Sequence, residues 1–114
     1  MGDVIIYHNP KCSKSRQALK LLHERGVEPK IVEYLKTPPD AEALARILGM
    51  LGMEPIDLIR RKEYKDLGLP DQQDDRKELI RLMVANPILI ERPIVVMGNE
   101  ARLGRPPEKV LEVL

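Results

Sequence analysis

The residue in this sequence with the clearest chemical potential is its single cysteine, Cys12. The β-branched run Val4 to Ile6 predicts a strand, Asn9-Pro10 predicts a turn, and the stretch from Ser13 to Arg25 predicts a helix. A thiol at the start of a helix lies beside unpaired backbone amides and the positive end of the helix dipole, and both favour the thiolate. The sequence therefore predicts an ionised, nucleophilic sulfur at residue 12.

Basic residues surround this cysteine. Lys11, Lys14 and Arg16 are close to it in sequence, and the helix has no acidic residue before Glu24. First turns of helices usually carry acids, so the reversed pattern indicates a functional reason. An ordinary thiol with a pKa near 8.5 is only about 3 % ionised at pH 7. The alternative is that Cys12 is a small buried apolar residue and that the bases form a solvated face.

Length and composition limit the remaining possibilities. The chain has 114 residues, which predicts one domain over 1–114 that needs neither disulfides nor metal. It contains 19 basic and 18 acidic residues, a net charge of +1, and no Phe or Trp. Nucleic acid is therefore not expected as a partner, because single-strand binders use aromatic platforms and basic surfaces. No segment is long and apolar enough for a signal or a membrane span, so we expect a cytoplasmic protein without a membrane partner.

The cysteine count also bears on redox chemistry. One cysteine cannot form an internal disulfide, and one cysteine with two histidines cannot complete a closed zinc site, so no metal is expected. If Cys12 is redox active, its resolving thiol must come from another molecule.

The elements that position Cys12 begin with a βαβ unit. Gly26 is expected to end the first helix, and Lys30 to Tyr34 predicts a second strand. A strand, a helix and a strand within about thirty residues place the two strands parallel.

A helical insertion over about 40–87 is expected next. Asp40 is expected to cap its first helix, and a short second helix is expected over 55–61. The segment 62–73 has no sustained period and is expected to be mainly loop, whereas a further helix is expected from about Asp74 to Ala85.

The last third predicts a hairpin and a closing helix. Residues 93–97 and 100–103 are expected to pair across a two-residue turn, Gly98-Asn99. The closing helix follows Pro106-Pro107, and its expected inward residues are Val110, Leu111 and Leu114. A βαβ half, a helical insertion and a ββα half, with the thiol at the start of the first helix, form a thioredoxin-like (glutaredoxin-like) α/β arrangement.

Five motifs in order along the chain carry a more specific resemblance. They are Tyr7-His-Asn-Pro-Lys-Cys12, Tyr34-Leu-Lys-Thr-Pro-Pro39, Leu58-Ile-Arg60, Asn86-Pro-Ile-Leu-Ile-Glu-Arg-Pro-Ile-Val-Val96 and Arg102-Leu-Gly-Arg-Pro106. Together they resemble the glutaredoxin-coupled arsenate reductases of the ArsC family over practically the whole chain. Ser13-Lys14 stands where those reductases typically carry Gly-Thr, and the charged tail that they have after the last helix is not present beyond Leu114. The sequence is therefore most similar to the shorter, arsenate-reductase-like branch.

The resemblance implies roles for individual residues. It implies that Cys12 is the nucleophile, that His8 helps to activate the thiol, and that Pro93 matches the proline that is cis and faces the reactive cysteine in thioredoxin-like folds. The oxyanion ligands that it implies are Arg60, Arg92 and Arg105. Guanidinium groups suit this task because they relieve the repulsion between a thiolate and an oxyanion and offer paired hydrogen bonds.

Several neighbouring residues have weaker assignments. Arg61 is an alternative to Arg60 as the oxyanion ligand, and either residue could instead be an exposed helix cation. Ser15 completes a Cys-x-x-Ser pattern and is expected to support the site by capping or bonding the thiolate, with Lys14 and Arg16 as supporting cations. His23 is expected on the surface, in the exposed half of the first helix.

The predicted activity is reduction of arsenate, or a similar oxyanion, to arsenite. Glutathione is the expected co-substrate, glutaredoxin is expected to clear the resulting mixed disulfide, and no bound cofactor is expected. An alternative is a glutathione-linked thiol oxidoreductase with another substrate. An Spx-like regulator that binds RNA polymerase is a second alternative, disfavoured because Ser15 removes the Cys-x-x-Cys switch. Phosphatase-like arsenate reductases are excluded because their Cys-x5-Arg loop would need an arginine at Ala18.

Overall fold

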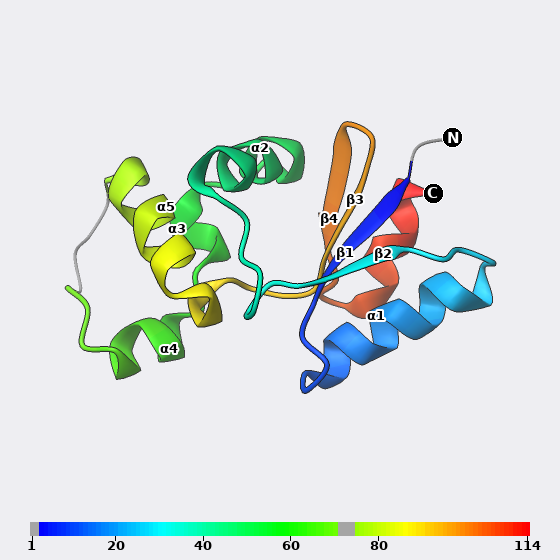
Figure 1. Cartoon of the computed structure of the whole chain (residues 1–114), viewed down its shortest axis with the longest axis horizontal. Coiled ribbons are helices and arrows are strands. Elements are labelled where there is room, and N and C mark those ends of the chain that lie inside the picture. Colours follow the sequence, from blue (N-terminus) through cyan, green and yellow to red (C-terminus); the bar gives the residue numbers. More distant parts are fainter. Residues whose placement is uncertain (1–2, 71–74) are drawn as a thin grey trace. The chain divides into compact units, whose positions relative to one another are not determined.

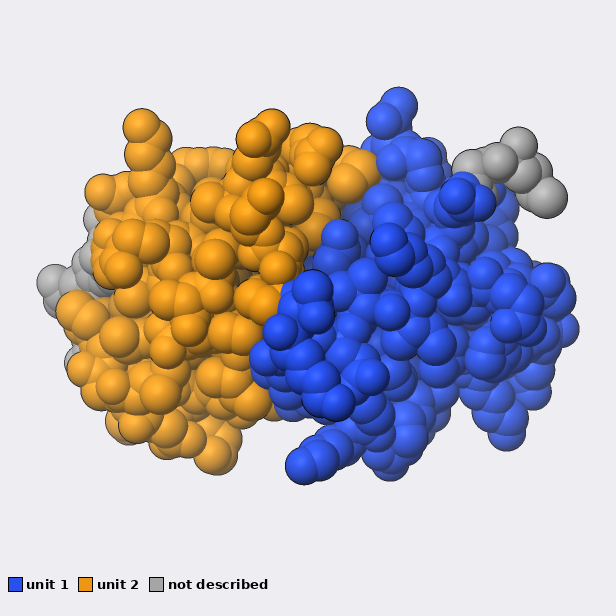
Figure 2. All heavy atoms as spheres, viewed as in Figure 1, with its two compact units in different colours: residues 1–37, 92–114 blue, residues 38–91 orange. Residues whose placement is uncertain are grey.

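The computed structural model of the chain describes residues 3–70 and 75–114. The chain divides into two compact units, which Figure 2 distinguishes by colour. Unit 1 comprises residues 1–37 and 92–114, and unit 2 comprises residues 38–91. Cys12 lies in unit 1, and unit 2 includes the segment 40–87.

Unit 1 contains a four-stranded mixed sheet (Figure 1). Its strands are β1 (Val4–His8), β2 (Lys30–Glu33), β3 (Ile94–Met97) and β4 (Glu100–Leu103), in the order β2-β1-β3-β4. β1 pairs parallel with β2, and the remaining neighbours pair antiparallel. The predicted βαβ and ββ halves are therefore present, and the thioredoxin-like fold class is confirmed.

Two helices complete unit 1. α1 (Ser13–Glu24) and the 3₁₀ helix η2 (Pro107–Val113) contact each other and bury an aliphatic core against the sheet. The fully buried members of this core are Ile6, Ala18, Leu22, Val95 and Val110. The members of this cluster are aliphatic, so its stability comes from close packing of their side chains.

The closing helix differs from its predicted form. It is a 3₁₀ helix with three residues per turn, so Pro107, Val110 and Val113 share its buried face. Leu114 is 47 % exposed, and Leu111 is only partly buried. The expectation that these two leucines point inward is wrong for Leu114 because it assumed the α-helical period.

Unit 2 is helical. Its elements are α2 (Ala41–Leu51), α3 (Pro55–Leu58), α4 (Arg61–Asp66), α5 (Arg76–Ala85) and the 3₁₀ helix η1 (Pro87–Leu89). Asp40 caps α2 as predicted, since its Oδ1 accepts from the amide of Ala43 at 2.8 Å. α5 contacts α2, α3 and η1, and the side chains of Leu58, Leu79 and Met83 are fully buried.

The helix α4 lies in a segment expected to be mainly loop. It has no buried residue, so it leaves no apolar period in the sequence. Polar pairs along the chain stabilise it instead, with Arg60 Nε 2.9 Å from Glu63 Oε2 and Lys62 Nζ 2.9 Å from Asp66 Oδ2. The start expected for α5 near Asp74 lies outside the described residues. In the part of the chain that the structure describes, no helix has the length and apolar character needed to cross a membrane.

Candidate functional site

Cys12 lies at the start of α1, where a tight loop joins this helix to β1. It is the N-cap residue of α1, with φ −95° and ψ 123°. Its amide donates to the carbonyl of Asn9 at 3.0 Å, and the side-chain Oδ1 of Asn9 accepts from the amide of Lys11 at 3.0 Å. These two bonds fix the loop and leave the cysteine side chain half-buried at the open end of the helix.

The surroundings of Cys12 lower the pKa of its thiol. Burial is the largest single effect and by itself would raise the pKa, but four other effects outweigh it. Hydrogen bonding from the backbone amide of Ser15, hydrogen bonding and positive charge from Arg92, and hydrogen bonding from the amide of Lys14 all favour the thiolate. The thiolate is therefore stabilised by a helix start and by a guanidinium from a segment far along the chain.

Ser15 connects Cys12 to a buried polar network. Its side chain is fully buried, and its Oγ lies 2.6 Å from His8 Nδ1 and 3.1 Å from the amide of Asn9. The hydroxyl of Ser15 thus bonds His8 and Asn9, while its backbone amide serves the sulfur. Ser15 was expected to cap or bond the thiolate. It does so with its backbone amide, because its hydroxyl bonds His8 and Asn9.

His8 ends β1 and is 6 % exposed. Burial lowers the pKa of its imidazole, the nearby Glu33 carboxylate opposes this shift, and Arg16 adds to it. A lowered pKa keeps the ring neutral at pH 7, with one nitrogen engaged by Ser15. His8 and Cys12 are thus linked through Ser15, one bonding its side chain and the other its amide.

Arg92 brings cationic donors to the sulfur. Its Nε and Nη1 are buried and have no hydrogen-bond partner within residues 3–70 and 75–114. Buried N–H groups without a partner are rare because leaving them unsatisfied costs free energy. A group that a bound anion would satisfy therefore lies beside the thiolate.

Arg105 joins this group through the main chain. Its Nε donates to the carbonyl of Arg92 at 3.1 Å, which ties the end of β4 to the segment before β3. The peptide bond between Arg92 and Pro93 is cis, as the resemblance implied, and so is the bond between Arg105 and Pro106. Two of the three expected arginines are thus brought together in unit 1.

Gly104 is a structural residue that the sequence reading did not single out. Its amide donates to the carbonyl of Pro93 at 2.8 Å. A Cβ at this position would lie 2.7 Å from Pro93 Cγ and 3.0 Å from Val110 Cγ1. A side chain at residue 104 would collide with the proline and the closing helix, so the position requires glycine. The sequence could have indicated this, because Gly104 lies within the last of the five motifs.

Arg60 lies in unit 2 and is held by two carboxylates. Its Nε is 2.9 Å from Glu63 Oε2, and its Nη1 is 3.2 Å from Glu91 Oε1. Both partners belong to unit 2, and the Arg60 side chain is 21 % exposed. Arg61, the alternative from the sequence, is exposed.

The other predicted residues lie at the surface. Lys14 and Arg16 are exposed, and Arg16 Nη1 donates to the carbonyl of Pro10 at 2.9 Å, so it supports the loop before Cys12. His23 is exposed, as expected. Within the described residues, no three His, Cys, Asp or Glu side chains are grouped so that they could hold a metal ion.

Comparison with known proteins places this geometry in a family. The family model described as "ArsC family" matches residues 7–113. The YfgD protein of Escherichia coli (strain K12) is 55% identical, with 98% of this chain and 97% of that protein covered. A protein of Neisseria meningitidis named arsenate reductase is 44% identical over all of both chains. A solved structure described as arsenate reductase from Vibrio cholerae is 49% identical, with a TM-score of 0.92 over 99% of this chain and 98% of that one.

Proposed function

The chain belongs to the ArsC family, and from this premise we propose that it reduces arsenate to arsenite with the Cys12 thiolate as nucleophile. The electrons come from glutathione, and glutaredoxin restores the free thiol. The proteins named arsenate reductase among its relatives support the substrate. We place the reaction in the cytoplasm, where thiols are kept reduced.

The observation that carries the proposal is the pair of buried, unpartnered N–H groups of Arg92 beside the thiolate. A thiolate repels an approaching oxyanion, and a guanidinium relieves this repulsion while donating two hydrogen bonds to paired oxygens. The positive charge and N–H groups of Arg92 would hold arsenate within reach of the sulfur. A neutral substrate would leave this charge uncompensated.

The first step is attack of the Cys12 sulfur on arsenic. One arsenate oxygen takes up protons and leaves as water, and a sulfur–arsenic(V) bond forms without a change in oxidation state. Arg92 and Arg105 stabilise the negative oxygens of the adduct. Their donors are held by the local fold before the substrate arrives, which is the usual basis of electrostatic catalysis.

The second step is the reduction, and it needs an external thiol. A glutathione thiolate bonds the Cys12 sulfur, and the electron pair of the sulfur–arsenic bond stays with arsenic, which leaves as arsenite. Arsenic gains two electrons, and the two sulfurs lose one each as they form a disulfide. A glutaredoxin thiolate then takes the glutathione sulfur and releases Cys12 as a thiolate.

Two further residues have proposed roles. His8 is proposed to hold Ser15, and through it the loop before the sulfur, in a fixed orientation. Arg60 is proposed as a third oxyanion ligand because it lies in the motif Leu58-Ile-Arg60. Its two ion pairs within unit 2 would fix its side chain. Arg60→Lys retains the charge without the paired donors, so we expect it to raise the KM for arsenate.

Coupled turnover tests the function. The reduced protein with arsenate, glutathione and glutaredoxin is expected to produce arsenite, and Cys12→Ser is expected to reduce this activity to the uncatalysed level. Ser13→Ala changes an exposed neighbour and is the matched control. A Cys12→Ser variant that retains arsenite production would overturn the assignment of the nucleophile. A wild-type protein that cleaves glutathione mixed disulfides but leaves arsenate unchanged would replace the proposal with a thiol oxidoreductase of another substrate.

A further inference from the structure

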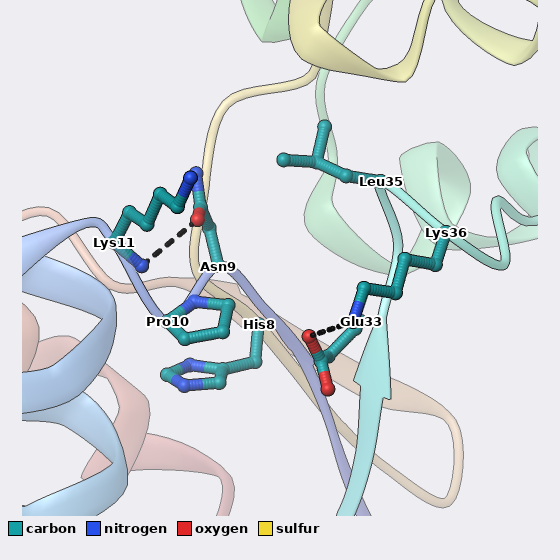
Figure 3. Close-up of a pocket in the computed structure, with 7 residues that line it drawn as sticks. All are labelled: His8, Asn9, Pro10, Lys11, Glu33, Leu35 and Lys36. Carbon is teal, nitrogen blue, oxygen red and sulfur yellow. Dashed lines mark hydrogen bonds and ion pairs between the residues drawn. The ribbon is translucent and has the colours of Figure 1, made fainter.

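Within unit 1, a pocket of about 380 Å³ is lined on one side by the residues that directly precede Cys12 in the chain (Figure 3). This volume is in the range of small-molecule binding sites. The β1–α1 loop contributes Asn9, Pro10 and Lys11, and the end of β2 and the turn after it contribute Glu33, Leu35 and Lys36. His8, at the end of β1, also lines the pocket, and the roles given to Cys12 and Arg92 make no use of it.

The pairing of the strands brings these two segments together. β1 and β2 are parallel, so their carboxyl ends meet at one edge of the sheet, where His8 is paired with Glu33. The amides of Lys36 and Thr37 both donate to the carbonyl of Glu33 at 2.9 Å, which folds the chain back beyond the strand. In Figure 3 the side chain of Leu35 points from this turn toward the loop that contains Asn9 and Lys11.

The charges of the pocket are arranged as two cations and one anion. Lys11 and Lys36 are exposed, and Lys36 Nζ lies 3.6 Å from Glu33 Oε1. The Lys36 side chain is 78% exposed, so this ion pair contributes little to stability and can exchange partners at low cost. Pro10 and Leu35 supply an apolar wall between the charged groups.

We propose that this pocket binds glutathione and delivers its thiol to Cys12; the inference rests on the proposed function and adds the place of the co-substrate. Glutathione carries two carboxylates and one ammonium group on a short peptide stem. The carboxylates would meet Lys11 and Lys36, the ammonium would meet Glu33, and the stem would lie on Leu35. Lys11 precedes Cys12 directly, so their Cα atoms are about 3.8 Å apart, and a ligand bound against Lys11 would bring its thiol toward the nucleophile.

Binding there would supply the second thiol in position. The bound thiolate and the Cys12 sulfur each lose one electron as their disulfide forms, and arsenic receives both as the sulfur–arsenic bond breaks. Holding the two sulfurs together converts an encounter in solution into a step within one complex. The pocket would therefore favour an anionic peptide thiol over a small neutral one.

Kinetics with a Lys36→Gln variant test this assignment. We expect its KM for glutathione to rise about tenfold, as for loss of one charge-assisted contact, while the KM for arsenate stays at the wild-type value. Turnover with 2-mercaptoethanol, which lacks carboxylates, is expected to be unchanged. Lys20→Gln removes an exposed lysine of α1 outside the pocket and is the matched control. A Lys36→Gln variant with the wild-type KM for glutathione would overturn the proposal.

A second assay separates this inference from the activity on arsenate. Glutathione disulfide exchanges with Cys12, forming the mixed disulfide and releasing one glutathione thiolate, and no arsenate takes part. We expect Lys36→Gln to slow this exchange but not the exchange with neutral hydroxyethyl disulfide. If the wild type does not turn over arsenate but Lys36→Gln still exchanges more slowly with glutathione disulfide, the proposed function is wrong and the glutathione site is supported. Equal exchange rates for wild type and variant would remove the site.

Discussion

The state of the Cys12 sulfur is decided by groups that one substitution can remove. Arg92 lowers the pKa of the thiol through hydrogen bonding and charge. In an Arg92→Gln variant the pKa is therefore expected to rise toward that of free cysteine. Alkylation by iodoacetamide against pH measures it, since only the thiolate reacts. The variant is expected to react more slowly than the wild type near neutral pH, and the two rates are expected to converge at alkaline pH.

Arg25→Gln is the control for this measurement, because Arg25 is an exposed residue at the other end of α1. If Arg92→Gln and the wild type have the same alkylation profile, the helix start alone sets the pKa.

We also expect Arg92→Gln to lower kcat/KM for arsenate about 100-fold, the usual effect of losing one donor to a developing oxyanion.

Ser15 is the second residue whose role one substitution isolates. Removing its Oγ in Ser15→Ala leaves His8 Nδ1 and the amide of Asn9 without this partner in a buried site. The expected loss is about 1–3 kcal/mol in the free energy of unfolding, measured by urea denaturation. Ser13→Ala, at an exposed position of the same helix, is expected to change stability by less than about 0.5 kcal/mol. Equal losses in the two variants would show that the network contributes nothing.

The residues of the site differ in how far the sequence could predict them. Cys12 was predictable because a turn, a helix start and a set of bases are local features. The bond between Ser15 Oγ and His8 was not, since a Cys-x-x-Ser pattern does not say whether the hydroxyl turns toward the thiolate or toward the strand. The missing information was the direction of one buried side chain.

At the scale of elements, Gly104 sets how closely β4, Pro93 and η2 approach. A methyl group added in Gly104→Ala would lie 2.7 Å from Pro93 Cγ, so either the proline or the closing helix must shift. The expected cost is about 1–3 kcal/mol, typical of overpacking, together with lower arsenate turnover because Arg92 precedes the displaced proline. Thermal unfolding and turnover of the same preparation provide both measurements.

Gly49→Ala is the matched control for this substitution. Gly49 lies in α2, and a Cβ there has no atom within 4 Å, so alanine is expected to stabilise the helix by about 0.5–1 kcal/mol. If Gly104→Ala leaves both the melting temperature and the turnover unchanged, the close approach does not constrain the site.

The elements predicted well and badly differ in one physical respect. The strand β1 and the helices α2 and α5 bury residues at a regular spacing, and this spacing is visible in the sequence. α4 buries nothing and is stabilised by ion pairs along the chain, so it leaves no apolar signal. The closing helix η2 has a signal of period three, which an α-helical template assigns to the wrong side chains.

At the scale of the whole molecule, the candidate residues are divided between the two units. The residues of unit 1 are Cys12, His8, Arg92 and Arg105, and unit 2 contributes Arg60. The sequence motifs identified all of these as candidates, because each motif is short and local. The grouping of the unit 1 residues depends on the strand order β2-β1-β3-β4, which no local pattern specifies.

The single thiol of the chain also limits what the molecule can do alone. Reduction of arsenate takes two electrons, and Cys12 gives up only one when it forms a disulfide. Without glutathione, we therefore expect at most one arsenite for every two chains, and only when two Cys12 sulfurs join in a covalent dimer. Arsenite assays and non-reducing electrophoresis of the same samples measure both quantities, with Cys12→Ser as the blank. One arsenite per chain without a dimer would require a second electron donor within the protein and would contradict the mechanism. Added glutathione is expected to raise the yield above one arsenite for every two chains. It is also expected to replace the dimer with a mixed disulfide that mass spectrometry detects.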